Sequence, residues 1–242
     1  MFDSRPGGGK LADRTAAVTG GSSGLGFALA GLLGEEGIRV SILGRDRQRL
    51  GDAVERLRAA GADARGIPCD ISKQDQVRAA FDGIARTGSL GLVFNVAGVG
   101  RFGPVEELTG DIIDEVTAGN LKGLMLVTAA ALPILRRGGG GAIVSVLSTA
   151  ALVGRAEESA YCAAKWGARG FMEAVRIGLK GTPVRTLTVY PGGMRTPFWS
   201  AESGRSPDLT TYMDPRDVAT QILRVVLDPG AAHVSEMTIS RG

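Results

Sequence analysis

The stretch T-G-G-S-S-G-L-G at residues 19–26 decides the fold of this chain. It follows a β-forming run at 15–19 and precedes an amphipathic pattern at 25–36 that predicts a helix. Glycines between a strand and a helix let the backbone turn tightly, and they let a pyrophosphate approach the free N–H groups of the helix. An ordinary glycine-rich turn is the alternative, but the position after the first strand favours a dinucleotide-binding loop.

Outward from this loop, short β-branched runs alternate with helical patterns. The predicted strands are 15–19, 39–43, 64–69, 90–95, 141–147, 184–190 and 234–239, and the predicted helices are 25–36, 45–60, 73–86, 110–136, 157–180 and 215–227. Such alternation predicts an α/β Rossmann fold, a doubly wound parallel sheet of seven strands with helices on both faces. Residues 11–242 are expected to form one domain, behind a disordered lead-in at 1–10.

Composition and charge exclude several classes of protein. The 242 residues carry a formal net charge of +3 and only 5% aromatic residues, which gives no basis for nucleic-acid binding. Two cysteines and no secretory leader argue against a secreted, disulfide-bonded protein, and no apolar stretch is expected to reach the ~18–20 residues that span a bilayer. We therefore expect a cytoplasmic protein that binds no membrane. His233 is the only histidine, so no metal site and no Ser-His-Asp triad is expected.

The ends of the second, third and fourth strands suggest how a cofactor binds, since ligands of such sheets lie beyond the carboxyl ends of the strands. Gly44 stands at the strand end where an acidic residue would bond the ribose of NAD, and the guanidinium of the following Arg45 suits the 2′-phosphate of NADP. A solvated helix start is the alternative, with Asp46 as N-cap in either case. Asp70 is expected either to accept from the adenine amino group or to cap the next helix. Small residues at 95–98 let the cofactor approach, and the Asn95 amide can brace neighbouring strands.

The strongest indication of chemistry is the pair Tyr161 and Lys165, which lie on one face of a helix because they are four residues apart. A phenol has a pKa of roughly 10, and a nearby cation is expected to lower it enough for acid–base catalysis. Ser148, at the end of the fifth strand, can bond a substrate oxygen. Asn120 follows a glycine inside a long helix, where helices disfavour both residues, and this indicates a water or backbone site.

Together these features resemble the short-chain dehydrogenase/reductase family. The matching pieces are T-G-G-S-S-G-L-G (19–26), Asp70, N-V-A-G (95–98), Asn120, Ser148, Y-C-A-A-K (161–165) and P-G-G-M-R-T (191–196). The resemblance implies that Tyr161 is the acid–base, that Lys165 also bonds the nicotinamide ribose, that Ser148 orients the carbonyl and that Asn120 holds a proton-relaying water. It also implies that Pro191 and Gly192 pass under the nicotinamide and that Thr196 bonds its carboxamide. The predicted cofactor-binding residues are Gly20, Ser22, Ser23, Gly24, Leu25, Gly26, Arg45, Asp70, Ile71, Asn95, Ala97, Gly98, Tyr161, Lys165, Pro191, Gly192, Met194 and Thr196.

The resemblance is incomplete at three positions. Val96 and Ser145 stand where the family often has asparagine, and Ser23 stands where many NADP-preferring members carry a basic residue. Because the acidic ribose ligand is missing beside Arg45, NADP(H) remains the expected cofactor, with NAD(H) as the alternative.

The predicted function is oxidoreduction of a ketone or aldehyde and its alcohol by hydride transfer. The alternatives are an NADP(H)-binding sensor or scaffold without catalysis, an NAD-preferring alcohol dehydrogenase of the same family, and an epimerase or dehydratase. We expect a substrate pocket lined by 99–102, 147–154 and a polar, mobile lid at 192–206, with Leu147, Leu152, Val153, Phe198 and Trp199 favouring a hydrophobic substrate. The resemblance also implies a homodimer or homotetramer through the helices at 110–136 and 157–180.

Overall fold

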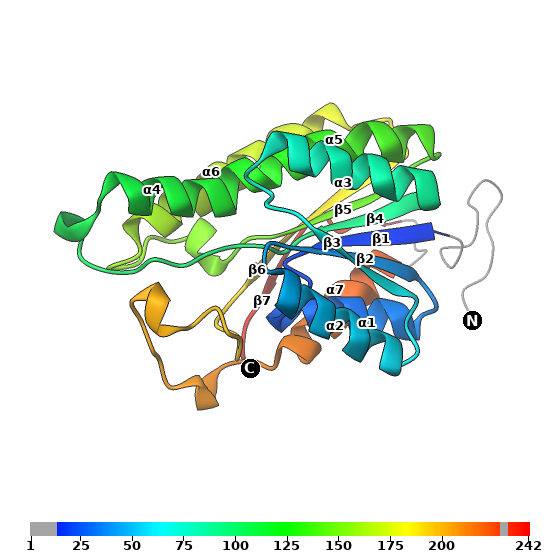
Figure 1. Cartoon of the computed structure of the whole chain (residues 1–242). Helices are drawn as coiled ribbons and strands as arrows, with labels where there is room; N and C mark the ends of the chain where they lie inside the picture. Colours follow the sequence, from blue (N-terminus) through cyan, green and yellow to red (C-terminus); the bar gives the residue numbers. More distant parts are fainter. Residues whose placement is uncertain (1–13, 228–231) are drawn as a thin grey trace.

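The computed structural model describes residues 14–227 and 232–242, so the predicted lead-in at 1–10 lies outside the described residues (Figure 1). The strands are β1 Arg14–Thr19, β2 Arg39–Gly44, β3 Ala64–Pro68, β4 Ser89–Asn95, β5 Gly141–Val146, β6 Val184–Pro191 and β7 Glu236–Ile239. The longer helices are α1 Gly24–Glu35, α2 Arg47–Ala59, α3 Gln74–Thr87, α4 Gly110–Thr117, α5 Gly123–Arg137, α6 Ser159–Gly178 and α7 Pro215–Leu227. Each predicted strand and helix is present, with ends shifted by a few residues.

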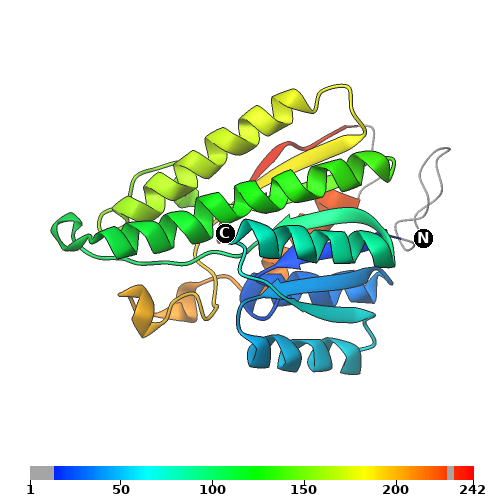
Figure 2. The same ribbon diagram turned by 45° about the horizontal axis from the view of Figure 1, so that its top comes forward.

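The strands form one parallel sheet in the order β3-β2-β1-β4-β5-β6-β7. Helices α1, α2 and α7 cover one face, and α3, α4, α5 and α6 cover the other (Figures 1 and 2). The predicted doubly wound sheet is therefore confirmed. The strands β1, β2 and β3 follow one another toward one edge of the sheet. The chain then crosses to the other side of β1, where β4 to β7 follow one another toward the opposite edge, so the strand order reverses between β1 and β4. A crevice opens at the carboxyl ends of the strands at such a reversal.

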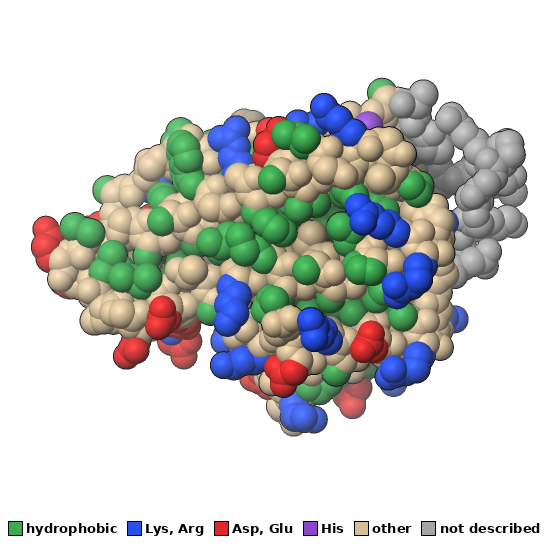
Figure 3. All heavy atoms as spheres, turned by 90° about the horizontal axis from the view of Figure 1, so that it is seen from above, with side chains coloured by type: hydrophobic (Ala, Val, Ile, Leu, Met, Phe, Trp, Pro, Cys, Tyr) green, Lys and Arg blue, Asp and Glu red, His purple; other side chains and the backbone are tan. Residues whose placement is uncertain are grey.

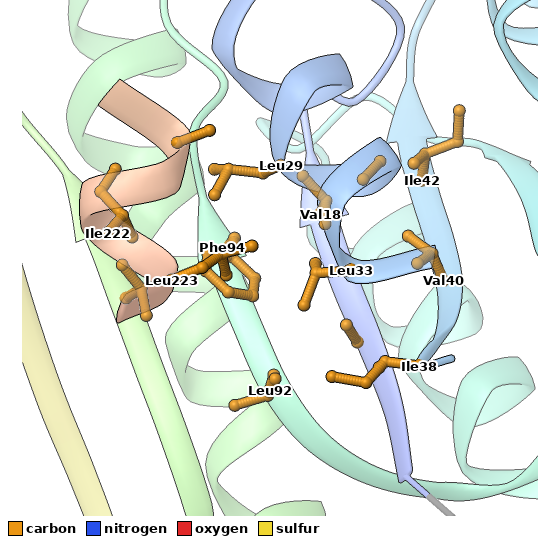
Figure 4. Close-up of a cluster of buried hydrophobic side chains, with 14 of the residues drawn as sticks. Val18, Leu29, Leu33, Ile38, Val40, Ile42, Leu92, Phe94, Ile222 and Leu223 are labelled. Atoms are coloured by element: carbon orange, nitrogen blue, oxygen red, sulfur yellow. The ribbon is translucent and has the colours of Figure 1, made fainter. Parts of the chain in front are cut away.

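Alternate residues of each central strand enter two separate cores. Ala16 and Val18 face α1 and α7, where they pack with Leu29, Phe94 and Ile222 (Figure 4). The intervening Ala17 and Val93 instead pack with α3 and α5 on the other face. Because both faces of the sheet are buried, the strands are apolar almost throughout, as parallel strands are.

The helix predicted at 110–136 is interrupted. Residues Ala118–Lys122 form a π-helical segment that joins α4 to α5 and contains the buried Asn120. An extra residue in one turn is a common feature of functional sites. The whole helical segment Gly110–Arg137 is long and apolar enough to cross a membrane by length and composition alone, although Lys122 interrupts its apolar run. It packs on β4, β5, α3 and α6 as a helix of this fold.

Candidate active site

A cavity of about 590 Å³ lies at the carboxyl edge of the sheet. Its walls come from the loops after β1, β4, β5 and β6, from the first half of α6, and from the segment 192–213 between β6 and α7. A second cavity of about 240 Å³ lies beside it, at the ends of β2 and β3. Gly20, Arg45, Gly98 and Val99 line both cavities.

The glycine loop forms one end of the large cavity. Gly20 has a φ of +67° and donates its N–H to the Leu43 carbonyl at 2.9 Å. A Cβ at Gly20 would lie 2.9 Å from the Ala97 Cα, so glycine is required on steric as well as conformational grounds. Helix α1 begins at Gly24, and the Ser23 side chain makes no capping bond. Its first N–H groups therefore remain free to bind an anion at the edge of the cavity.

Thr19 holds the loops after β1 and β4 together. Its hydroxyl donates to the Phe94 carbonyl at 3.3 Å and accepts from the Val96 and Ala97 N–H groups at 3.0 and 3.1 Å. Thr19 belongs to the quoted motif, but no role was predicted for it. Its position directly before the glycines, at the end of an apolar strand, was the signal in the sequence.

The small cavity is lined by Arg45, Asp70, Ile71 and Ala97, as predicted for the adenosine end of a dinucleotide. The Asp70 carboxylate accepts from the Ser72 N–H at 2.9 Å and from the Ser72 hydroxyl at 2.8 Å. The N-cap of α3 is Lys73, so Asp70 does not cap that helix. Although burial opposes ionisation, the bonds from Ser72 and the positive charge of Arg45 hold the pKa of Asp70 below its usual value. Asp46 caps α2 by accepting from the Arg49 N–H, as predicted.

Tyr161, Lys165 and Ser148 meet on one wall of the large cavity. Helix α6 carries the first two, and Ser148 stands just beyond β5, where its hydroxyl accepts from the Ala150 N–H at 3.1 Å. The Lys165 ammonium lies 5.5 Å from the centre of the Tyr161 ring. Both side chains are buried, at 7% exposure for Tyr161 and 4% for Lys165.

Burial dominates the acid–base properties of this pair. It raises the pKa of the Tyr161 phenol above its ordinary value, and hydrogen bonding with Ser148 only partly opposes the rise. It lowers the pKa of the Lys165 ammonium to about 8. The expectation that Lys165 brings the phenol pKa down is therefore wrong for the protein alone, because desolvation of the phenolate is the largest effect on this pKa.

Asn120 lies beneath the floor of the cavity. Its amide donates to the Val99 carbonyl at 2.7 Å and to the Val116 carbonyl at 2.9 Å, the backbone site that the sequence predicts. Its Oδ1 atom is buried and has no hydrogen-bond partner among the described residues. A Cβ at Gly98 would lie 2.7 Å from this oxygen and 3.6 Å from the Lys165 Nζ. Gly98 therefore covers both polar groups without filling the space beside them.

Two of the predicted cofactor residues do not line either cavity. Asn95 is buried and donates to the hydroxyls of Thr128 and Ser145, each at 3.3 Å, which is the bracing of strands expected of it. Ser22 is also absent from the walls, whereas Ser23, Gly24, Leu25 and Gly26 contribute to the large cavity. Pro191, Gly192, Met194 and Thr196 line the opposite side of the same cavity.

The family model described as short chain dehydrogenase matches residues 14–205. The chain belongs to this family. The predicted family membership is thereby confirmed, and with it the prediction of an oxidoreductase enzyme.

Several relatives cover most of this short-chain dehydrogenase. A Streptomyces coelicolor protein assigned as a ketoacyl reductase is 30% identical over 93% of this chain and 94% of its own. The sepiapterin reductase of Chlorobaculum tepidum is 34% identical over 75% of this chain and 74% of its own. The D-threitol dehydrogenase of Mycolicibacterium smegmatis is 33% identical over 75% and 70%.

Solved structures agree with this assignment. A variant of actinorhodin polyketide ketoreductase, solved with NADPH, superposes with a TM-score of 0.86 at 28% identity and covers 95% of this chain and 97% of its own. A metagenomic short-chain oxidoreductase in complex with NADP superposes with a TM-score of 0.83 at 29% identity, over 96% and 98%.

The end of the cavity near Tyr161 differs from the predicted apolar pocket. Phe198 and Trp199 do line it, with the Phe198 ring centre 5.8 Å from that of Tyr161. Leu152 instead packs into the core beneath α5 and α6, and Val153 is exposed, so the prediction that they line the pocket is wrong. The walls also carry charged side chains that were not predicted to line the pocket, among them Arg101, Glu115, Arg155, Glu158, Glu202 and Arg205. The sequence signal for a charged wall was the presence of Arg155 and Glu158 a few residues before Tyr161.

Substituting Gly98 tests the cover over Asn120. We expect Gly98→Ala to press its methyl group on the Asn120 Oδ1 and to destabilise the protein by about 1–3 kcal/mol, measured by urea unfolding. Gly51→Ala is the matched control, because a Cβ at this exposed position of α2 meets nothing within 4 Å. The control is expected to be neutral or stabilising by up to about 1 kcal/mol. Equal effects of the two substitutions would contradict the steric argument.

Proposed function

We propose that this enzyme interconverts a ketone or aldehyde and its alcohol with NADP(H) as cofactor. The observation that carries the proposal is one continuous cavity with two chemically distinct ends. A glycine loop with free helix N–H groups forms one end, and Tyr161, Lys165 and Ser148 form the wall near the other. The first suits a pyrophosphate, and the second suits proton exchange with an oxygen atom.

The residues present fit a nicotinamide dinucleotide. The glycine at position 20 keeps the loop free of a side chain, and the small cavity beside it offers Asp70 and Ile71 to an adenosine. The buried Asn120 Oδ1 and the Lys165 ammonium flank Gly98, so polar groups that need a partner lie in the same region. Bound NADPH would supply a hydride from nicotinamide C4 to the carbonyl carbon.

The proposed roles of the side chains follow from their chemistry. Ser148 donates a hydrogen bond to the carbonyl oxygen and stabilises the negative charge that develops there. Tyr161 gives its phenolic proton to that oxygen during reduction and accepts one during oxidation. Its raised pKa keeps it protonated at neutral pH, which suits the reducing direction. Lys165 bonds the ribose and stabilises the phenolate when it forms, and Asn120 holds a water that relays protons to Lys165.

Arg45 supports the choice of NADP(H) over NAD(H). It lines both cavities and acts electrostatically on Asp70, so its guanidinium lies at the proposed adenosine end. Two structural neighbours were solved with NADPH or NADP. A guanidinium without an acidic neighbour on β2 favours a 2′-phosphate there.

The relatives support a carbonyl or alcohol substrate, because their names include two reductases and one polyol dehydrogenase. A sensor or scaffold that only binds the cofactor remains the alternative in another class. Burying Tyr161 beside Lys165 costs solvation energy that binding alone would not require, and this favours the enzyme. The cytoplasmic location expected from the sequence stays a prediction.

Replacing the phenol tests the proposed acid–base. We expect Tyr161→Phe to bind NADPH as tightly as the wild type while turnover falls by about 10²–10⁴-fold, since the proton donor is removed. Binding would be followed by NADPH fluorescence, and turnover by NADPH consumption over a panel of ketones and aldehydes. Tyr190→Phe is the control, because the Tyr190 hydroxyl bonds Glu236 at 2.8 Å and lines neither cavity. Retained turnover in Tyr161→Phe would refute the mechanism.

Cofactor preference is tested at Arg45. We expect Arg45→Ala to raise the KM for NADPH about 10- to 100-fold, the value of a charge-assisted hydrogen bond to phosphate. The KM for NADH should change little, because NADH has no 2′-phosphate. Arg47→Ala provides the matched control, since Arg47 lies on α2 but lines neither cavity. Parallel losses for both cofactors would overturn the assignment.

We also propose that two copies associate through α4–α5 and α6. Only 39% of the apolar 18-residue window in the Gly110–Arg137 helix is buried within one chain. Ile113 and Trp166 are exposed on these helices, at 44% and 49%. Figure 3 shows hydrophobic side chains gathered along this helical face with few charges between them. A second copy would remove this apolar surface from water.

Light scattering after gel filtration checks this association. The expected mass is about twice or four times the 25.0 kDa of one chain, as closed symmetric assemblies give. Trp166→Glu should shift the protein toward the monomer, because it introduces a charge on the apolar face. Val234→Glu, at a similarly exposed position (43%) that lies in none of these helices, should not. A monomeric wild type would contradict the proposal.

A further inference from the structure

Arg205 joins the segment 192–213 to the beginning of α6. Its guanidinium lies 2.8 Å from Glu158 Oε1 and 3.3 Å from Glu157 Oε2. The two carboxylates are unlike each other, since the Glu157 side chain is 56% exposed and the Glu158 side chain only 5%. The bond to Glu158 therefore pairs a cation of this segment with a carboxylate inside the protein.

Burial makes Glu158 dependent on Arg205. A carboxylate taken out of water is costly unless it is paired and hydrogen-bonded. Among the ion pairs of the described residues, Arg205 is the only cation within 4.0 Å of Glu158. The position of the segment 192–213 in this structure therefore provides the buried Glu158 with its cationic partner.

Further contacts connect this ion pair to the loop after β4. The Phe102 N–H donates to the Ser203 carbonyl at 2.8 Å, and the Gly103 N–H donates to the Glu157 carbonyl at 2.8 Å. Glu157 has a φ of +61°, a conformation that residues with a side chain rarely adopt. Its strained turn brings its carboxylate and that of Glu158 to the same guanidinium.

The contacts continue to the proposed acid–base. The Arg205 guanidinium lies 5.8 Å from the centre of the Phe102 ring. That ring meets Tyr161 edge-on at 5.6 Å between ring centres. Glu158 is the N-cap residue of α6, three residues before Tyr161, and its charge acts on the phenol.

We propose that Arg205 is a positioning residue that latches the segment 192–213 over the cavity and, by neutralising the buried Glu158, makes proton transfer at Tyr161 depend on closure. The proposal rests on the proposed role of Tyr161 as acid–base. It assigns a function to a charged pair that touches neither the cofactor-binding loop nor the reacting atoms.

The charges around Tyr161 give the latch its direction. The groups that act on the phenol are Ser148 beyond β5, Arg155 in the following loop, the N-cap residue Glu158 and Cys162 on α6, with the Lys165 ammonium over its ring. The negative charge of Glu158 raises the pKa of Tyr161, in addition to the larger effect of burial. An arginine paired with Glu158 places a positive charge beside that carboxylate and opposes its effect on the phenol. Closure therefore helps Tyr161 to release its proton, and opening hinders it.

Alcohol oxidation is the direction that tests this coupling, because Tyr161 must then act as a base. The measurement is the pH dependence of kcat/KM with NADP⁺, whose rising limb reports the ionisation of the free enzyme. We expect Arg205→Met to move this limb to higher pH by about half a unit or more, because Glu158 loses its partner. Glu158→Gln should move it to lower pH, and Arg205→Lys should stay near the wild type.

The double variant separates electrostatics from folding. With both charges removed, Arg205→Met/Glu158→Gln should return the limb close to its wild-type position, so that the two shifts are strongly non-additive. Arg216→Met is the matched control, because Arg216 pairs with Glu35 at 2.9 Å on the surface at 57% and 52% exposure. Its limb should not move, and thermal unfolding and NADPH fluorescence should show all variants folded and able to bind.

Two results would overturn the latch. One is an unmoved limb in folded Arg205→Met, and the other is a double variant whose limb stays at the Arg205→Met position. Either result, with Tyr161→Phe inactive, refutes the latch and leaves the proposed function intact. Turnover retained by Tyr161→Phe would instead refute the proposed function and the latch together.

Discussion

The removal of Lys165 and Tyr161 from water is the constraint on which the site depends. Each is almost fully buried, and desolvation moves their pKa values in opposite directions, toward the neutral forms. Burying a phenol and an amine costs solvation free energy, so hydrogen bonds or charges in their surroundings must compensate for it. A substrate would provide this compensation through Ser148, and a cofactor would provide it through the polar groups beside Gly98. Without such ligands, burial favours the neutral forms of Tyr161 and Lys165.

The sheet provides the rest of the geometry by bringing distant segments to one edge. The order reverses at β1 and β4, and the Thr19 hydroxyl fixes the two strand ends with three hydrogen bonds. Loops that carry Gly20, Ser148 and Gly192 therefore face the same cavity although they are far apart in sequence. The π-helical turn contains Asn120, whose amide donates to the Val99 carbonyl, directly after Gly98 in the chain. Parallel strands need crossover helices, and these long connections leave the carboxyl edge free for the site.

Local patterns sufficed to predict the fold and most of the cavity wall. Glycine spacing, strand ends and the four-residue interval between Tyr161 and Lys165 are properties of neighbouring residues, which a sequence displays directly. The balance of burial and charge at Tyr161 is not local, because it depends on how completely other segments cover the phenol. The prediction that Leu152 lines the pocket was wrong for a similar reason, since an apolar side chain suits a core as well as a pocket. Neither distinction is visible before the packing is known.

Charged residues at the substrate end were the largest omission, and they change the character of the site. A segment rich in glycine and serine predicts mobility, yet Arg205 binds it to a carboxylate that cannot easily be left alone. Phe198 and Trp199 of this segment cluster with Phe102, with ring centres within 6.0 Å of one another. The Glu158 side chain is only 5% exposed and the Tyr161 side chain is also buried, and low exposure to water strengthens the electrostatic link between the two. The same desolvation that makes Tyr161 a weak acid thus makes it sensitive to a partner that arrives with closure.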